Sequence, residues 1–109
     1  MWRAESRWLH APGETAGHPV VRVRSAGSTL WYLADLVHFP IEMAHVNWSA
    51  FAGRDVSGLA ASRARILAAA VGSPAMFTHG RFPCWGFVEP SEGSGWKWRY
   101  AGAEGLDAG

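Results

Sequence analysis

The sequence predicts an α/β fold in which one main helix covers a sheet. Three observations carry this prediction. Apolar and charged residues alternate over 19–24, which is the pattern of a half-buried strand. Apolar residues recur at helical spacing over 56–71. Two further alternating segments, 85–89 and 96–100, flank a stretch rich in Pro, Ser and Gly, as in a β-hairpin with a long turn.

The first part of the chain is expected to form three strands. Segment 6–11 is a short strand that ends at the Pro12-Gly13 turn, and 19–24 follows it. Segment 29–34 is β-branched, aromatic and aliphatic, so we expect a more deeply buried strand. The turn at 26–28 would pair this strand with 19–24 as a hairpin.

The middle of the chain is expected to be helical. Pro40 interrupts any regular element, and a short helix is possible over 41–45. The main helix is expected to begin after Asp55, a good N-cap residue, and to end at Gly72 before Pro74. A buried strand over 75–78 then leads to His79. Two arginines are expected to flank the buried stripe of the main helix: Arg63 and Arg65.

Composition limits the class of protein. The chain has 109 residues, of which 49% are hydrophobic, enough for one packed domain or part of one. Its net charge is +1 and its arginines are scattered, so we expect no nucleic-acid partner. It has one cysteine and no apolar run of the roughly 20 residues that span a bilayer. Because residues 1–10 carry charges and no apolar core, we expect no secretion signal. These features favour a cytoplasmic protein without a membrane partner.

Three polar residues stand where predicted strands end. Glu14 follows the first strand, Asp35 the third and His79 the fourth. Loops at one edge of an α/β sheet collect functional groups. Two carboxylates and an imidazole are a possible ligand set for a divalent metal. Such triples are common in a chain of this length, so each residue can equally be an ordinary loop residue.

Five segments, in order along the chain, are similar to motifs of metallo-β-lactamase-fold hydrolases, and they span about residues 8–100. The first two are 12–18 (PGETAGH), which resembles a PGHTPGH turn, and 34–40 (ADLVHFP), which resembles a DxxHxP segment. The others are 61–63 (ASR) in the helix, 78–83 (THGRFP), and the closing hairpin with GFV and GWKW. The resemblance is strongest to the lactonase-like and organophosphate-hydrolase-like branch. It implies half of an αβ/βα sandwich, with a mainly antiparallel or mixed sheet.

The resemblance also implies roles for these residues. Asp35 would be the aspartate that bridges two metal ions, and His79 a ligand of the second ion. Glu14 stands where the family has a histidine ligand of the first ion, which is a departure from the pattern. The implied ion is zinc or another divalent metal such as manganese. Four residues would support the site or line its pocket: His18, His38, Trp48 and Phe82.

The family's HxHxDH motif, which supplies most of the metal ligands, does not occur in these residues. We therefore expect residues 1–100 to be a C-terminal half of the fold, followed by a flexible tail at 101–109. The resemblance implies a metal-dependent hydrolase of an ester, lactone or phosphoester, with a small-molecule substrate. Because most ligands are missing, this chain alone is expected to be inactive. The alternative is a non-catalytic half-domain that binds a complementing N-terminal half or a second copy of itself.

Overall fold

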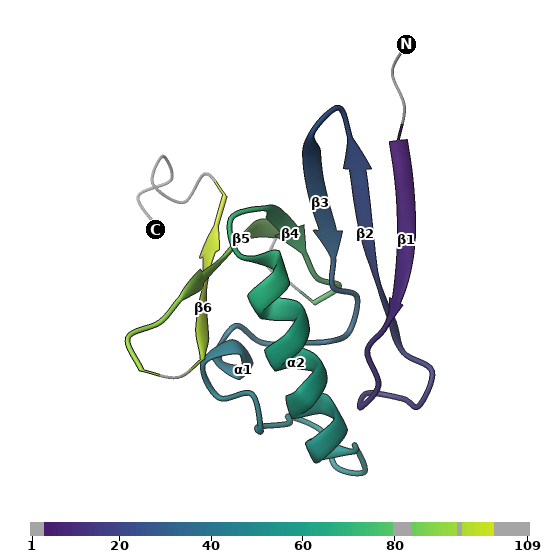
Figure 1. Ribbon diagram of the computed structural model, residues 1–109. Helices are drawn as coiled ribbons and strands as arrows, with labels where there is room; N and C mark the ends of the chain where they lie inside the picture. Colours follow the sequence, from purple (N-terminus) through teal and green to yellow (C-terminus); the bar gives the residue numbers. More distant parts are fainter. Residues whose placement is uncertain (1–3, 80–83, 94, 102–109) are drawn as a thin grey trace.

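The computed structural model describes residues 4–79, 84–93 and 95–101 (Figure 1). The predicted order of three strands, helix and three strands is confirmed. The elements are β1 (Ala4–His10), β2 (Pro19–Ser25), β3 (Ser28–Tyr32), α1 (Ile41–Ala44), α2 (Val56–Ala70), β4 (Pro74–Met76), β5 (Trp85–Pro90) and β6 (Trp96–Tyr100). No helix in these ranges has the length and hydropathy needed to cross a membrane.

The six strands form one mixed sheet whose spatial order is also the order of the strands along the chain. Every neighbouring pair is antiparallel except β3 and β4, which are parallel. A parallel pair needs a long crossover connection, and α2 lies within that connection. The parallel pairing places the C-terminal ends of β3 and β4 at the same edge of the sheet.

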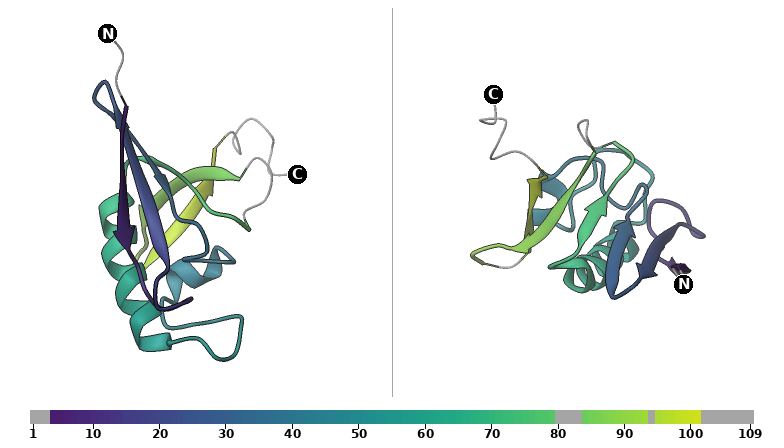
Figure 2. Two further views of the ribbon diagram at one scale, coloured as in Figure 1. Left: turned by 90° about the vertical axis from the view of Figure 1, so that its right-hand side faces the viewer. Right: turned by 90° about the horizontal axis from the view of Figure 1, so that it is seen from above.

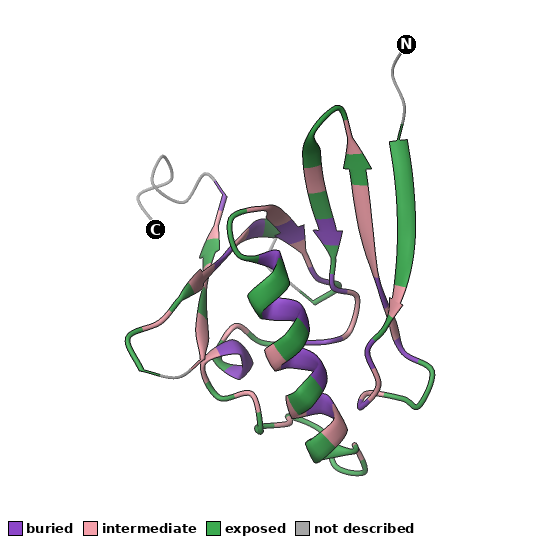
Figure 3. Cartoon of the chain, in the orientation of Figure 1, coloured by how far each residue is buried: buried purple, intermediate pink, exposed green. Residues whose placement is uncertain are grey.

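Helix α2 lies against one face of the sheet, and the core fills the space between them (Figures 2 and 3). The fully buried apolar side chains of α2 include Leu59, Ile66 and Leu67, and the strands and adjoining loops contribute Val20, Trp31, Leu33, Ala75, Phe77 and Val88. Both predicted ends of the helix are confirmed. The Asp55 side chain accepts a hydrogen bond from the Gly58 N–H at 3.0 Å. Gly72 has a φ of 87°, the left-handed conformation common just after a helix.

Arg63 is completely buried, so the prediction that it flanks the buried stripe is wrong, whereas Arg65 is exposed. The reason is that segment 36–50 wraps over this side of α2 and presents backbone carbonyl groups to the Arg63 guanidinium. Glu42, also buried, lies 3.3 Å from Arg63 as its ion-pair partner. Burial lowers the pKa of Arg63, and the Glu42 carboxylate opposes that change.

In β2, an arginine lies on the face of the sheet that the helix covers. The pleat puts Arg22 on the helix side, where its guanidinium lies 5.9 Å from the centre of the Trp31 ring. Val21 therefore lies on the other face of the sheet, in one cross-strand row with Trp8, Tyr32, Met76 and Trp85. We call these five residues the open-face row. The described residues leave Trp8 71% and Trp85 40% exposed, so both faces of this sheet carry apolar side chains.

Candidate metal centre

The loops that follow β3 and β4 bring together two of the predicted ligands. One ligand atom from each of Asp35, His38 and His79 lies within 4.8 Å of the other two. The Nε2 atom of His79 is 3.3 Å from Oδ1 of Asp35. The rings of His38 and His79 are 4.8 Å apart, centre to centre. We call these three residues the strand-edge triad. His38, expected only to support the site, is as well placed as Asp35 and His79 to be a ligand.

The chemistry of the triad fits a divalent metal. Oδ1 of Asp35 is buried, yet it accepts no hydrogen bond from the described residues. Its nearest ionisable partner is Nε2 of His79 at 3.3 Å, and a carboxylate oxygen without a hydrogen-bond donor is suited to bind a cation. Two imidazoles and one carboxylate are the donor set of many catalytic zinc sites, in which a fourth position stays open for water. These donors therefore fit zinc better than calcium or magnesium, which prefer shells of oxygen atoms.

His18 holds the backbone of Asp35. Its Nε2 accepts a hydrogen bond from the Asp35 N–H at 3.1 Å, and its Nδ1 donates to the Ala11 carbonyl at 3.3 Å. Both ring nitrogens are thus used, which leaves His18 no lone pair for a metal. Ala34, just before Asp35, has a φ of 51°, and its carbonyl accepts from the Thr78 N–H at 3.0 Å. His18 therefore positions Asp35, and Ala34 joins this loop to the one that carries His79.

Glu14 lies on the other side of His38. Its Oε1 is 3.6 Å from Nε2 of His38, and its Oε2 accepts a hydrogen bond from Nε of Arg54 at 2.8 Å. The hydrogen bond with Glu14 is the main reason that the pKa of Arg54 is raised. The structure thus gives Glu14 a protein partner at the edge of the triad. Its predicted role as a metal ligand stays a prediction.

Helix α2 anchors the loop that contains Glu14. The hydroxyl of Ser62 donates to the Pro12 carbonyl at 2.7 Å, and the N–H of Asp55 donates to the Gly13 carbonyl at 3.1 Å. Gly13 packs so closely that a Cβ atom there would lie 2.4 Å from the Leu59 Cα. The helix segment 61–63 therefore holds two loops of the site. Ser62 binds the loop that contains Glu14, and Arg63 binds the loop that contains Asp35 and His38.

The buried pair of Glu42 and Arg63 holds the loop that contains Asp35 and His38. Arg63 donates from Nε to the Leu36 carbonyl at 2.8 Å, next to Asp35 in the chain. Oε1 of Glu42 accepts from the His38 N–H at 2.6 Å. The two charged side chains thus fix the backbone on both sides of Val37, between two members of the triad.

Trp48 and Phe82 are the two aromatic residues that the sequence suggests as pocket-lining, and for both this role stays a prediction. Trp48 is 51% exposed and stacks on the ring of His45, with a centre distance of 4.0 Å. Phe82 lies outside the described residues. Phe51, which sequence reasoning missed, packs its ring edge-to-face with His38 at 4.7 Å and lies beneath Arg54 at 5.5 Å. No periodicity or motif marks Phe51 or Arg54, because both lie in irregular chain.

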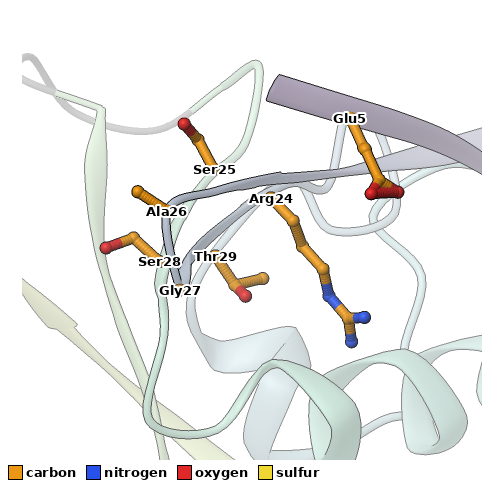
Figure 4. A pocket seen from close by; sticks show the side chains of 7 residues that line it. All are labelled: Glu5, Arg24, Ser25, Ala26, Gly27, Ser28 and Thr29. Carbon is orange, nitrogen blue, oxygen red and sulfur yellow. The ribbon is translucent and has the colours of Figure 1, made fainter. Parts of the chain in front are cut away.

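Two surface hollows are lined by residues other than the strand-edge triad. One hollow of about 460 Å³ lies at the opposite end of the sheet, over the β2–β3 turn, and Figure 4 shows its lining. It is lined by Glu5, Arg24, Ser25, Ala26, Gly27, Ser28 and Thr29. A smaller hollow of about 300 Å³ touches Glu14 and the start of α2. Within the triad, the side chains of His79 and Asp35 are 51% and 40% exposed, whereas His38 is buried.

The mixed sheet, the covering helix and the strand-edge triad together define half of a metallo-β-lactamase fold, and comparison with solved structures confirms this resemblance. One similar structure is AidC, a dizinc quorum-quenching lactonase in complex with a product. It has 30% identity and a TM-score of 0.78, over 87% of this chain and 33% of the lactonase. Another is AbOPH, a hydrolase of the β-lactamase superfamily, with 19% identity and a TM-score of 0.77, over 87% of this chain and 34% of that one.

The chain thus spans about a third of the length of the solved structures that it matches. No family model and no curated protein matches the sequence. At 19% identity, the likeness to AbOPH shows the fold alone.

Proposed function

We propose that this chain supplies part of the metal site of a metal-dependent hydrolase of the metallo-β-lactamase superfamily. The observation that carries the proposal is the strand-edge triad, in which Oδ1 of Asp35 accepts no hydrogen bond from the described residues and lies 3.3 Å from Nε2 of His79. The likeness to a dizinc lactonase supports zinc as the ion and a lactone, ester or phosphoester as the small-molecule substrate. Zinc titration against an Asp35→Ala/His79→Ala variant tests the proposal, as set out at the end of the Discussion.

The three residues divide the work of such a site. Asp35 contributes negative charge through Oδ1, and the two imidazoles of His38 and His79 contribute nitrogen donors. A zinc ion bound there would lower the pKa of a bound water to near neutrality and so provide a nucleophile. His18 keeps Asp35 in place through the backbone hydrogen bond, an arrangement that tunes both the position and the affinity of metal ligands.

The remaining parts of the site would come from residues that this sequence does not contain. The chain covers about a third of each solved hydrolase that it matches. Three ligand groups leave the rest of a dinuclear shell unfilled. We therefore expect hydrolysis to require a complementing half, either covalently joined or bound as a separate chain, and expect the isolated chain to be inactive.

The open-face row favours a second candidate function, a non-catalytic module that binds another protein or a second copy of itself. Five apolar side chains lie side by side across β1 to β5. Among them Trp8 is 71%, Tyr32 39% and Trp85 40% exposed. Contiguous exposed apolar patches of this kind mark interaction surfaces or lead to aggregation. A complementing half would cover this face in the first candidate, and a second copy would cover it in the second.

If the chain self-associates through this face, its apparent mass should rise with concentration in size-exclusion chromatography. Trp8→Ser should shift the midpoint of that transition to at least tenfold higher concentration, because the most exposed apolar side chain of the row is removed. Trp48→Ser, which removes a 51% exposed tryptophan outside the row, is the matched control and should leave the midpoint unchanged. A strict monomer at every concentration would exclude self-association and leave the complementing half as the partner.

A further inference from the structure

Glu14 has a neighbouring side chain at each of its two carboxylate oxygens. Oε2 accepts the 2.8 Å hydrogen bond from Arg54, and Oε1 lies 3.6 Å from the His38 imidazole. Only 11% of the Glu14 side chain is exposed. Glu14 does not belong to the group in which one ligand atom each from Asp35, His38 and His79 lies within 4.8 Å of the other two. For Glu14 to coordinate a metal ion through Oε2, its hydrogen bond with Arg54 would have to break.

Arg54 is held where a cation beside Glu14 would lie. Its guanidinium rests 5.5 Å from the centre of the Phe51 ring, and Phe51 also packs against His38. Asp35 adds a weaker attraction for the Arg54 charge. The guanidinium thus neutralises one of the two carboxylates at this edge. A second metal ion there would meet a fixed positive charge at short range.

We infer that Arg54 excludes Glu14 from the metal-binding set, so that this chain binds a single divalent ion on Asp35, His38 and His79. This inference rests on the proposed function, because it concerns the same site. It departs from the dinuclear pattern of the lactonase that the chain resembles, and it gives His38 a ligand position.

Zinc alone, titrated into the 109-residue chain by calorimetry, tests the inference with four proteins: wild type, Glu14→Gln, Arg54→Ala and the Arg54→Ala/Glu14→Gln double variant. Wild type and Glu14→Gln should each bind one equivalent, and Glu14→Gln should weaken binding by less than about tenfold, because Glu14 is not a ligand and only the uncompensated Arg54 charge opposes the ion. Arg54→Ala should tighten zinc binding about tenfold, the size of effect that one added partner group has at metal sites. The double variant should lose that gain.

Arg99→Ala is the matched control, because Arg99 pairs with Glu89 through the same atoms at the same 2.8 Å, on β5 and β6 and away from the triad. It should leave zinc binding unchanged. Two equivalents in the wild type, a tenfold loss in Glu14→Gln, or no change in Arg54→Ala would each overturn the inference while leaving the proposed function in place. Zinc binding that the Asp35→Ala/His79→Ala variant does not reduce, or no binding in any protein, would overturn both.

Discussion

Arg63→Ala is expected to lower the free energy of unfolding by about 3–5 kcal/mol, because it leaves a buried charge without its partner. Glu42 would stay buried in the interior, 3.3 Å from where the guanidinium had been. Three backbone carbonyls, those of Leu36, Val46 and Trp48, would also lose their donor. Urea denaturation followed by tryptophan fluorescence measures the change.

Arg65→Ala is the matched control for this substitution. Arg65 lies two positions further along α2, is exposed, and donates one hydrogen bond to the His10 carbonyl at 2.6 Å. Its loss should cost about 1 kcal/mol. The double variant Arg63→Met/Glu42→Gln should recover part of the stability lost in Arg63→Ala, since it removes both charges. Equal losses for Arg63→Ala and Arg65→Ala would contradict the account of the buried pair.

Gly13→Ala is expected to cost about 3 kcal/mol or more, from backbone strain together with overpacking. Gly13 has a φ of 138°, a conformation that residues with a side chain rarely adopt. The added Cβ would lie 2.4 Å from the Leu59 Cα and 2.5 Å from the Leu59 N. The loop could relieve this clash only by moving away from α2, which would displace Glu14 as well.

Thermal denaturation of Gly13→Ala beside Gly17→Ala separates this effect from a general effect of alanine in the loop. Gly17 belongs to the same loop, and a Cβ atom there would meet nothing within 4 Å. Gly17→Ala should change stability by no more than about 1 kcal/mol, and in the stabilising direction where alanine restricts the unfolded chain. A loss in Gly17→Ala as large as that in Gly13→Ala would show that the loop does not depend on its contact with α2.

Local patterns were enough to predict most of the fold. Asp55 and Gly72 marked the ends of α2, and the segments on either side of the Pro90–Gly95 stretch marked the last hairpin. The alternation in β2 located that strand but not the side on which it packs. Two faces of a sheet can both be apolar, and alternation alone does not reveal which one the helix covers. In the structure, Val21 lies on the open face of the sheet and Arg22 on the face that the helix covers.

The site could be predicted only in part. Asp35 and His79 were placed together because both follow strands that end at one edge. The partnership of Glu14 with Arg54 spans 40 residues and joins two irregular loops, so no local pattern indicates it. The burial of Arg63 was missed for a related reason. Helical periodicity treats arginine as polar, whereas the wrapping of segment 36–50 supplies the carbonyls that make its burial favourable.

The central claim is that Asp35 and His79 belong to a metal site, and calorimetric titration of the chain with zinc and manganese tests it most directly. The account predicts one equivalent of zinc for the wild type and none for Asp35→Ala/His79→Ala, with manganese bound more weakly because two of the three donors are imidazoles. Thermal denaturation of the same double variant should show that it still folds. A folded double variant that binds zinc as tightly as the wild type would contradict the account.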